Sequence, residues 1–515
     1  MNRTRLVPLI LLLICLVVRS LARFLSDTTS TTTTCVSRNC ERQMAVKGPA
    51  TNHYARNAIM YDKVPALFQK EYEKIDSDYD EARCERYGYS YRATQMPRRV
   101  FFGSMVADEY WDVFQAHATE VYNVYHVVAL LESNTTHMNT PREMRWKRGS
   151  QAWKAVVQDE LFGGETKTVL EYWLEDFPKL LGMDRECAQR AAIVDLWIKE
   201  GMTKDDVGVM ADIDEIVSRD FLRAVQVCDI PQFRPGQDCS KPKLIALAIS
   251  FESSPECIKR DAWFHPDLIS GECIDGVGDP TNRAVAVRKI DGIHGERTDE
   301  YGGRSMNGMR DDIKESGRWP LYNGPDIRLL PGSVEKPAQR HGKRGLYQKG
   351  NEEIWGVAFH LHNFFDNFST LRNKYHSYGH GESIGFNGAL FVPLTQLGPD
   401  IDTLVRCAKK LPNSAHPYKT DIGKCTFEGG FDGTGGNKPI FFLNETYRRE
   451  RHALLTRIVL EDENRFGSEY STNGTWVGNT DYGTRTQEKR KQQENDHQPR
   501  VEQIQFPATE STVIQ

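Results

Sequence analysis

The sequence predicts an α/β fold in which helices flank a sheet. Short apolar runs of strand length alternate with segments of helical periodicity. Strands are expected from Val100 and over 124–131, 207–211 and 354–362, and helices over 108–122, around 153–157, over 187–199, after Ser218 and over 444–461. Such alternation is typical of a parallel sheet with helical crossovers. The 515 residues are enough to bury at least one large core.

Both ends of the chain are predicted to lie outside the folded domain. Arg3 and Arg5 precede an apolar run from Leu6 to Val18, which is typical of a signal peptide or, if uncleaved, a signal anchor. We therefore expect a leader over 1–25, a Ser/Thr-rich stalk and stem over 26–95, the folded domain over 96–465 and a polar, disordered tail over 466–515.

The leader and the cysteines predict a secretory compartment. An uncleaved leader gives a single-pass type II membrane protein and a cleaved one releases the chain, and in both cases the body enters the lumen. Of the eleven cysteines, Cys15 lies in the leader, and the even number that remains suits disulfide pairing. Cys257 and Cys273, like Cys35 and Cys40, are near enough to pair locally, although spacing leaves the connectivity open. No long basic stripe occurs, so nucleic acid is not an expected partner.

Two aspartates that are separated by a single residue follow the apolar run 207–211. They are Asp212 and Asp214, with Glu215 next in the chain. Open α/β sheets bind ligands in the crevice beyond the carboxyl ends of their strands. Oxygen ligands at that place suit a hard divalent cation, Mg²⁺ or Mn²⁺, that holds a diphosphate. The alternative is structural, with the acids capping the next helix and favouring its positive end.

A second polar cluster ends the run 124–131. Glu132 can accept hydrogen bonds from a base or a ribose, Asn134 follows it, and Arg142 can meet a phosphate in bidentate fashion. The alternative is a strand-end turn held by Asx and Ser/Thr side-chain hydrogen bonds.

A pair of histidines marks the last expected strand. His360 and His362 alternate with apolar residues, so both face the same side. One of them could complete the coordination of a metal that carboxylates already hold, or the pair could form a plain polar strand face. Asp366 follows the strand, and Arg372 with Lys374 could bind an anionic phosphate.

These clusters resemble glycosyltransferase family 17, the family of the bisecting β-1,4-mannosyl-glycoprotein N-acetylglucosaminyltransferase. Three blocks carry the resemblance. They are Glu132-Ser133-Asn134-x-Thr136 with Pro141-Arg142; Asp205-Asp206-Val207 followed by Asp212-x-Asp214-Glu215-Ile216 and Arg219-Asp220; and His360. The sequence departs from the family pattern at Val217, Phe359 and His362, where the family usually has Pro, Trp and Ser.

The resemblance implies a GT-A-like, Rossmann-type mixed sheet with flanking helices. It implies an inverting transfer of N-acetylglucosamine from UDP-GlcNAc to a mannose of N-linked glycans on glycoproteins, in the Golgi lumen. The cofactor it implies is Mn²⁺ or Mg²⁺, held by Asp212, Asp214 and His360. The implied donor-binding residues are Glu132, Asn134, Arg142, Arg190 and Arg219. The base that deprotonates the acceptor stays open between Glu215 and Asp366.

Two alternatives remain. A transferase of the same fold could use another donor or acceptor, because the Gly-, Arg- and Asp-rich stretch 281–350 has no counterpart in the three blocks. This stretch is expected to form long loops, with or without an irregular subdomain. The chain could also be a non-catalytic lumenal carbohydrate-binding protein. The carboxylates at 212, 214 and 215 argue against the second alternative, since a binder does not need a diphosphate clamp.

Overall fold

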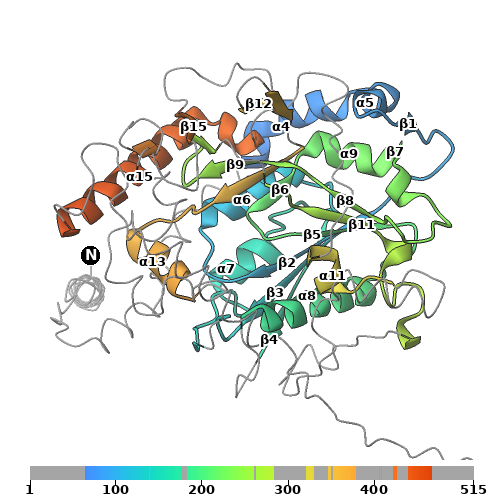
Figure 1. The fold of residues 1–515 in the computed structure, drawn as a ribbon, viewed down its shortest axis with the longest axis horizontal. Helices are drawn as coiled ribbons and strands as arrows, with labels where there is room; N and C mark the ends of the chain where they lie inside the picture. Colours follow the sequence, from blue (N-terminus) through green and yellow to red (C-terminus); the bar gives the residue numbers. More distant parts are fainter. Residues whose placement is uncertain are drawn as a thin grey trace, which may run out of the picture. The chain divides into compact units, whose positions relative to one another are not determined.

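Two larger sheets and their flanking helices make up most of the described chain (Figure 1). The computed structural model describes residues 64–137, 140–174, 182–259, 263–282, 321–329, 346–349, 352–355, 357–377, 405, 407–408, 422–425 and 439–466. The predicted leader and the predicted tail beyond residue 466 lie outside these residues. Among the helices of the described ranges, none combines the length and the apolar character that crossing a membrane requires.

The first sheet has six strands in the order β4-β3-β2-β5-β11-β8. In that order they span Lys167–Trp173, Val127–Ser133, Val100–Val106, Val207–Met210, Asp267–Ser270 and Lys243–Ile245. The first four strands run parallel, whereas β11 is antiparallel to both β5 and β8. The predicted α/β fold with a mixed sheet and flanking helices is therefore confirmed.

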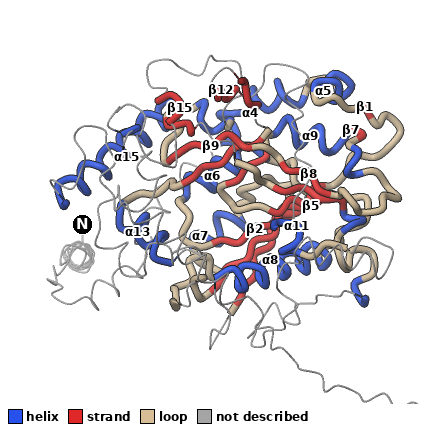
Figure 2. Tube along the Cα trace, viewed as in Figure 1, coloured by secondary structure: helices blue, strands red, loops and turns tan. Residues whose placement is uncertain are grey.

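Helices cover both faces of this sheet (Figure 2). They are α6 (Trp111–Val121), α8 (Gly182–Lys199) and α9 (Arg219–Val227). Phe101 of β2 shares an apolar core with α8, and Phe102 shares another with α6 and α9, as the two-residue period of a strand requires. Gly103 allows α8 to approach closely, because a Cβ at this position would lie 2.8 Å from Trp197 Cζ2.

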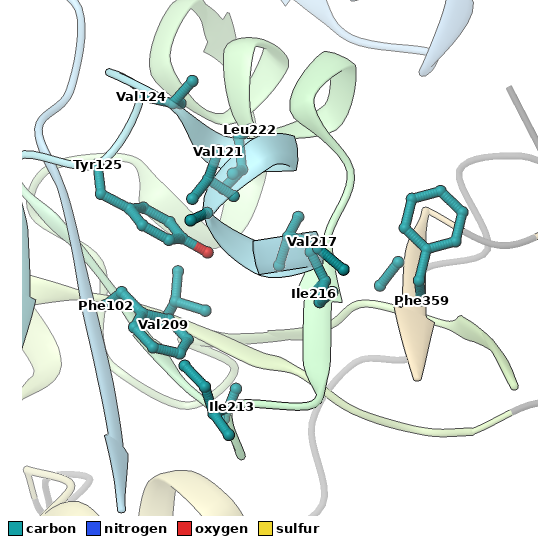
Figure 3. Close-up of a cluster of buried hydrophobic side chains, with 14 of the residues drawn as sticks. Phe102, Val121, Val124, Tyr125, Val209, Ile213, Ile216, Val217, Leu222 and Phe359 are labelled. Carbon is teal, nitrogen blue, oxygen red and sulfur yellow. The ribbon is translucent and has the colours of Figure 1, made fainter. Parts of the chain in front are cut away.

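The second sheet continues the core that contains Phe102. Its five strands have the order β15-β10-β9-β14-β6 and span Ile422–Cys425, Cys257–Lys259, Ala248–Glu252, Ala358–His362 and Glu215–Val217. β14 is parallel to β9 and antiparallel to β6. Figure 3 shows Ile216 of β6 and Phe359 of β14 in one cluster with Phe102 and Val209 of the first sheet, so a single apolar core joins the two sheets.

An N-terminal segment packs onto the same core. It comprises α4 (Val64–Asp76), α5 (Asp80–Arg86) and β1 (Ser90–Tyr91), which pairs with β7 (Cys228–Asp229). Phe68 and Tyr72 of α4 are buried, and a disulfide joins Cys84 to Cys228. The sequence boundary at residue 95 assigns this segment to a stem, whereas the structure packs residues 64–91 onto the folded domain, because the apolar face of α4 is buried there.

The remaining elements are short or lie toward the C-terminus. They are α7 (Gln151–Trp153), a π-helical turn (Lys154–Gln158), 3₁₀ turns (Pro231–Phe233, Gly271–Cys273, Pro280–Asn282 and Ile440–Leu443), α11 (Gly324–Leu329), β12 (Leu346–Lys349), β13 (Glu352–Trp355), α13 (Phe368–Ser377) and α15 (Glu445–Phe466). The expected strand 354–362 is divided between β13 and β14. The stretch 281–350, expected to form loops, contains α11 and β12.

The structure decides the disulfide connectivity that the spacing left open. Cys257 pairs with Cys407, and Cys273 pairs with Cys239. The local pairing of Cys257 with Cys273 that the spacing allowed does not form, because the chain passes from β10 of the second sheet to β11 of the first between these two residues. The proposed pair of Cys35 and Cys40 lies outside the described residues.

Candidate active site

A pocket of about 400 Å³ opens where strands of the first sheet end. Its lining includes Val106 at the end of β2, Ser133 at the end of β3 and Asp212 just after β5. β14 and α13 contribute further residues to the lining. The carboxyl edge of the parallel strands is where α/β sheets bind their ligands, so we take this pocket as the candidate active site.

Asp212 lies between two arginines at the edge of the pocket. Its carboxylate accepts hydrogen bonds from Arg190 Nη2 at 2.9 Å and from Arg328 Nη2 at 3.3 Å. Burial would raise the pKa of Asp212, but the two guanidinium groups hold this pKa well below its usual range. Arg190, which comes from α8, also pairs with Glu186 at 2.8 Å. Asp212 is therefore ionised and is balanced by cations of the protein itself.

Arg328 is a pocket residue that no sequence motif marks. It comes from α11, within the stretch that the sequence assigns to loops. α11 packs against α8 so closely that a Cβ on Gly324 would lie 2.0 Å from the carbonyl oxygen of Arg190. The absence of a side chain at Gly324 thus lets α11 bring Arg328 to the same carboxylate that Arg190 contacts.

Asp214 and His360 face each other across the pocket lining. His360 Nε2 lies 3.8 Å from Asp214 Oδ2. Burial raises the pKa of Asp214 well above its usual value, and the neighbouring carboxylates of Asp212 and Glu215 raise it further, although Lys374 acts in the opposite sense. A mostly buried carboxyl group next to an imidazole is a donor set that suits a divalent cation.

The predicted metal ligands converge only in part. Within the described residues, the ligand atoms of Asp212, Asp214 and His360 do not all lie within 4.8 Å of one another. The group that does meet this distance is Cys257, Cys407 and His452, and its two cysteines are joined as a disulfide. Asp214 with His360 is therefore the part of the predicted set that the fold brings together, since Asp212 turns to Arg190 and Arg328.

Four rings form a row in the pocket lining. Trp263 stacks on His360 with ring centres 4.6 Å apart, and His265 lies 5.4 Å from Trp263 on one side and His362 lies 5.1 Å from His360 on the other. The Trp263 Nε1–H donates to Glu215 Oε1 at 2.6 Å, which fixes the indole. His360 and His362 line the pocket together, as the alternation along β14 predicts, whereas no motif marks Trp263 or His265.

Of the three predicted donor-binding residues at or after the end of β3, one lines the pocket and two lie outside its lining. Arg142 lines the pocket and donates to the Ser133 carbonyl at 2.9 Å. Glu132 is fully buried outside the lining, where its carboxylate accepts the backbone N–H groups of Arg145 and Trp146 at 2.5 and 2.9 Å. Asn134 also lies outside the lining, and its side-chain oxygen accepts from the hydroxyl of the next residue, Thr135.

Three other predicted residues do not line the pocket. Arg219 donates to Asp76 at 2.6 Å and to the Tyr122 carbonyl at 2.8 Å, which ties α9 to α4. Glu215 is 1% exposed and is hydrogen-bonded to Arg328 and Trp263. Asp366 accepts from the Asn367 side chain at the start of α13. Arg219 and Asp366 therefore lie outside the pocket lining, whereas Glu215 is the strand partner of His360 between β6 and β14 and turns its carboxylate to Arg328 and Trp263.

Part of the folded domain is similar to a known protein family. Residues 51–234 match the model of glycosyltransferase family 17. These 184 of the 515 residues are similar to glycosyltransferase family 17. The match contains Glu132, Arg142, Asp212 and Asp214 and ends before His360. The predicted resemblance to this family is therefore confirmed over the matched residues. No protein with a curated description matches the chain. Glycosyl transfer is the class of reaction that the family 17 domain indicates.

Proposed function

We propose that this family 17 domain transfers N-acetylglucosamine from UDP-GlcNAc to a mannose of N-linked glycans, with inversion at the anomeric carbon. The observation that carries the proposal is the meeting of Asp214 and His360 in a pocket at the strand ends of a family 17 domain. The volume of about 400 Å³ lies within the range of pockets that hold small molecules.

Mn²⁺ or Mg²⁺ is the proposed cofactor, with Asp214 and His360 as its ligands and Asp212 as a further candidate. When bound, such an ion supplies Lewis-acid stabilisation of the negative charge that grows on the departing diphosphate. The protein's own cations support the same charge, because Arg142, Arg190 and Lys374 line the pocket. Glu132 and Asn134, which lie outside the pocket lining, would act indirectly by holding the segment that carries Arg142.

The proposed location is the Golgi lumen, with residues 1–25 as a type II membrane anchor. Three disulfides among the described cysteines support an oxidising compartment. The proposed acceptors, N-linked glycans of glycoproteins, belong to the secretory pathway, so the proposed location and the proposed reaction agree.

The test is a transfer assay with the full chain. Radiolabelled UDP-GlcNAc and a pool of mannose-terminated N-glycans are incubated with the protein, with Mn²⁺ and with EDTA, and the product linkage is determined. We expect label in the glycan with Mn²⁺, none with EDTA, and recovery when Mn²⁺ is restored. A panel of other nucleotide sugars follows, and transfer from one of these alone would replace UDP-GlcNAc as the donor. Glycan binding that needs neither metal nor nucleotide, without any transfer, would instead favour a carbohydrate-binding protein.

A further inference from the structure

The two outer histidines of the ring row share one feature. His265 Nδ1 lies 2.6 Å from Asp267 Oδ2, and His362 Nδ1 lies 2.8 Å from Glu252 Oε2. Both carboxylates are fully buried, whereas the histidine side chains are 25% and 18% exposed and line the pocket. An imidazole held at Nδ1 by a buried carboxylate is oriented to exchange a proton through its other nitrogen.

The charge state of Asp267 fixes the tautomer of His265. Lys243 Nζ lies 2.9 Å from Asp267 Oδ1, and Arg328 Nη1 lies 3.4 Å from Asp267 Oδ2. Burial would raise the pKa of Asp267, but Lys243 and the hydrogen bond from His265 hold this pKa below its usual value. An ionised carboxylate can only accept hydrogen bonds, so His265 Nδ1 carries the proton. Nε2 of the neutral ring is then the basic nitrogen.

The candidates suggested by sequence leave the role of base unfilled. Glu215 and Asp366 do not line the pocket, and Glu215 is held by Arg328 and Trp263. We propose that His265, oriented by Asp267, is the catalytic base that deprotonates a hydroxyl of the acceptor hexopyranose. This inference rests on the proposed function and adds to it the place where the acceptor binds.

The surroundings of the two outer histidines decide between them. Next to His265, Trp263 is 37% exposed and the adjacent Phe264 is 51% exposed, and this pair of aromatic side chains gives the apolar face of a sugar ring a surface to pack on. His362 is instead next to Asn363, whose side-chain oxygen lies 3.4 Å from Lys374 Nζ, a cation suited to phosphate. The acceptor is therefore assigned to the His265 end of the row and the donor phosphates to the His362 end.

In the proposed step, the sugar passes from the diphosphate to the acceptor hydroxyl. The acceptor oxygen forms a bond to the anomeric carbon while its proton passes to His265 Nε2. The bond from the anomeric carbon to the diphosphate oxygen breaks, and its electron pair leaves with the nucleoside diphosphate. The imidazolium, stabilised by the Asp267 carboxylate, then returns its proton to solvent.

The experiment compares full-chain variants in the UDP-GlcNAc transfer assay, with Mn²⁺-dependent UDP binding and thermal unfolding measured alongside. We expect His265→Ala to lower kcat by about 10²–10⁴-fold, to leave UDP binding unchanged, and to recover part of its activity when imidazole is added. His265→Gln fills more of the space and should show the same loss, which covers the case in which the alanine variant fails to fold. His362→Ala should weaken donor binding without rescue by imidazole. His126→Ala, a change at an exposed histidine outside the pocket lining, should leave transfer unchanged.

Glu109 is the competing base, because it lines the pocket and burial raises its pKa to about 7. Glu109→Gln is therefore made as well, and should keep more transfer activity than His265→Gln. Two results would overturn the inference and leave the proposed function standing. In the first, the wild type transfers sugar and both His265 variants transfer it equally well. In the second, imidazole restores the activity of His362→Ala and not that of His265→Ala. A wild-type chain that transfers no sugar from any nucleotide donor would overturn the proposed function, and this inference with it.

Discussion

Arg328 and Glu215 form a buried ion pair beside the pocket. Arg328 Nη2 lies 2.6 Å from Glu215 Oε1, and Arg328 Nη1 lies 2.8 Å from Glu215 Oε2. Arg328 comes from α11 and Glu215 from the start of β6, so the pair joins a helix to a strand more than a hundred residues earlier in the chain. The same carboxylate holds the Trp263 indole at 2.6 Å. The ion pair therefore fixes both the position of Asp212 and the ring row.

Arg328→Met should destabilise the protein. The change leaves Glu215 buried without its charge partner, and breaking a buried ion pair typically costs about 3–5 kcal/mol of unfolding free energy. Urea unfolding measures the loss. Arg449→Met is the matched control, because its pair with Glu445 is mostly exposed and should contribute less than about 1 kcal/mol. Equal stability of the two variants would contradict a structural role for the pair of Arg328 and Glu215.

Asp214→Ala should abolish metal binding while the fold is kept. If Asp214 and His360 hold the cation, removing the carboxylate lowers transfer by about 100-fold or more. Titration of Mn²⁺ in the presence of UDP checks the binding directly, without reference to activity. Asp229→Ala, at a partly exposed carboxylate paired with Arg234, is the control and should bind Mn²⁺ as the wild type does. Wild-type Mn²⁺ affinity in Asp214→Ala would remove Asp214 from the ligand set.

Glu120 should make stability depend on pH. Its buried carboxylate accepts the backbone N–H groups of Arg219 at 2.8 Å and Ile440 at 2.7 Å, and burial raises its pKa from 4.5 to about 7. Because the folded chain holds this proton more tightly than the unfolded chain, the contribution is fully present below pH 4.5 and is lost as the pH rises through about 7. Burial lowers the pKa of His117 from 6.5 to about 4. This group therefore acts in the opposite sense, because its contribution to stability is lost as the pH falls from 6.5 toward 4.

Glu120→Gln isolates this contribution. Between the two pKa values one such group changes the unfolding free energy by at most about 1.4 kcal/mol per pH unit. We expect the stability of the variant, measured by urea unfolding at a series of pH values, to rise less than that of the wild type as the pH falls from 7 toward 4.5. Parallel pH profiles for the two proteins would show that Glu120 titrates alike in the folded and unfolded chains.

The N-terminal segment should be required for folding. A chain that starts at residue 96 loses α4, the disulfide between Cys84 and Cys228, and the ion pair between Asp76 and Arg219. Loss of such a disulfide alone typically costs about 2–5 kcal/mol. We expect this chain to be unfolded by circular dichroism and a chain that starts at residue 48 to be folded. A stable, folded chain from residue 96 would restore the boundary that the composition suggests.

Local pattern was sufficient wherever local forces dominate. The strand ending before Asp212, the helix after Ser218 and the shared side of His360 and His362 follow from apolar periodicity, and the structure has all three. The partners of these side chains do not follow from it. Asp212 and Asp214 are one residue apart, yet Asp212 faces Arg190 and Arg328 while Asp214 faces His360.

The sequence by itself determined the α/β class, the resemblance to family 17 and the carboxylates at the strand end, because a strand, its helix and the motif between them are encoded within a few dozen residues. Only the tertiary structure decided that residues 64–91 belong to the folded domain, that Cys257 pairs with Cys407, and that Arg328 and His265 reach the pocket. The physical reason is that these contacts join segments far apart in the chain, and burial and charge pairing select them only after the two sheets have packed on one core.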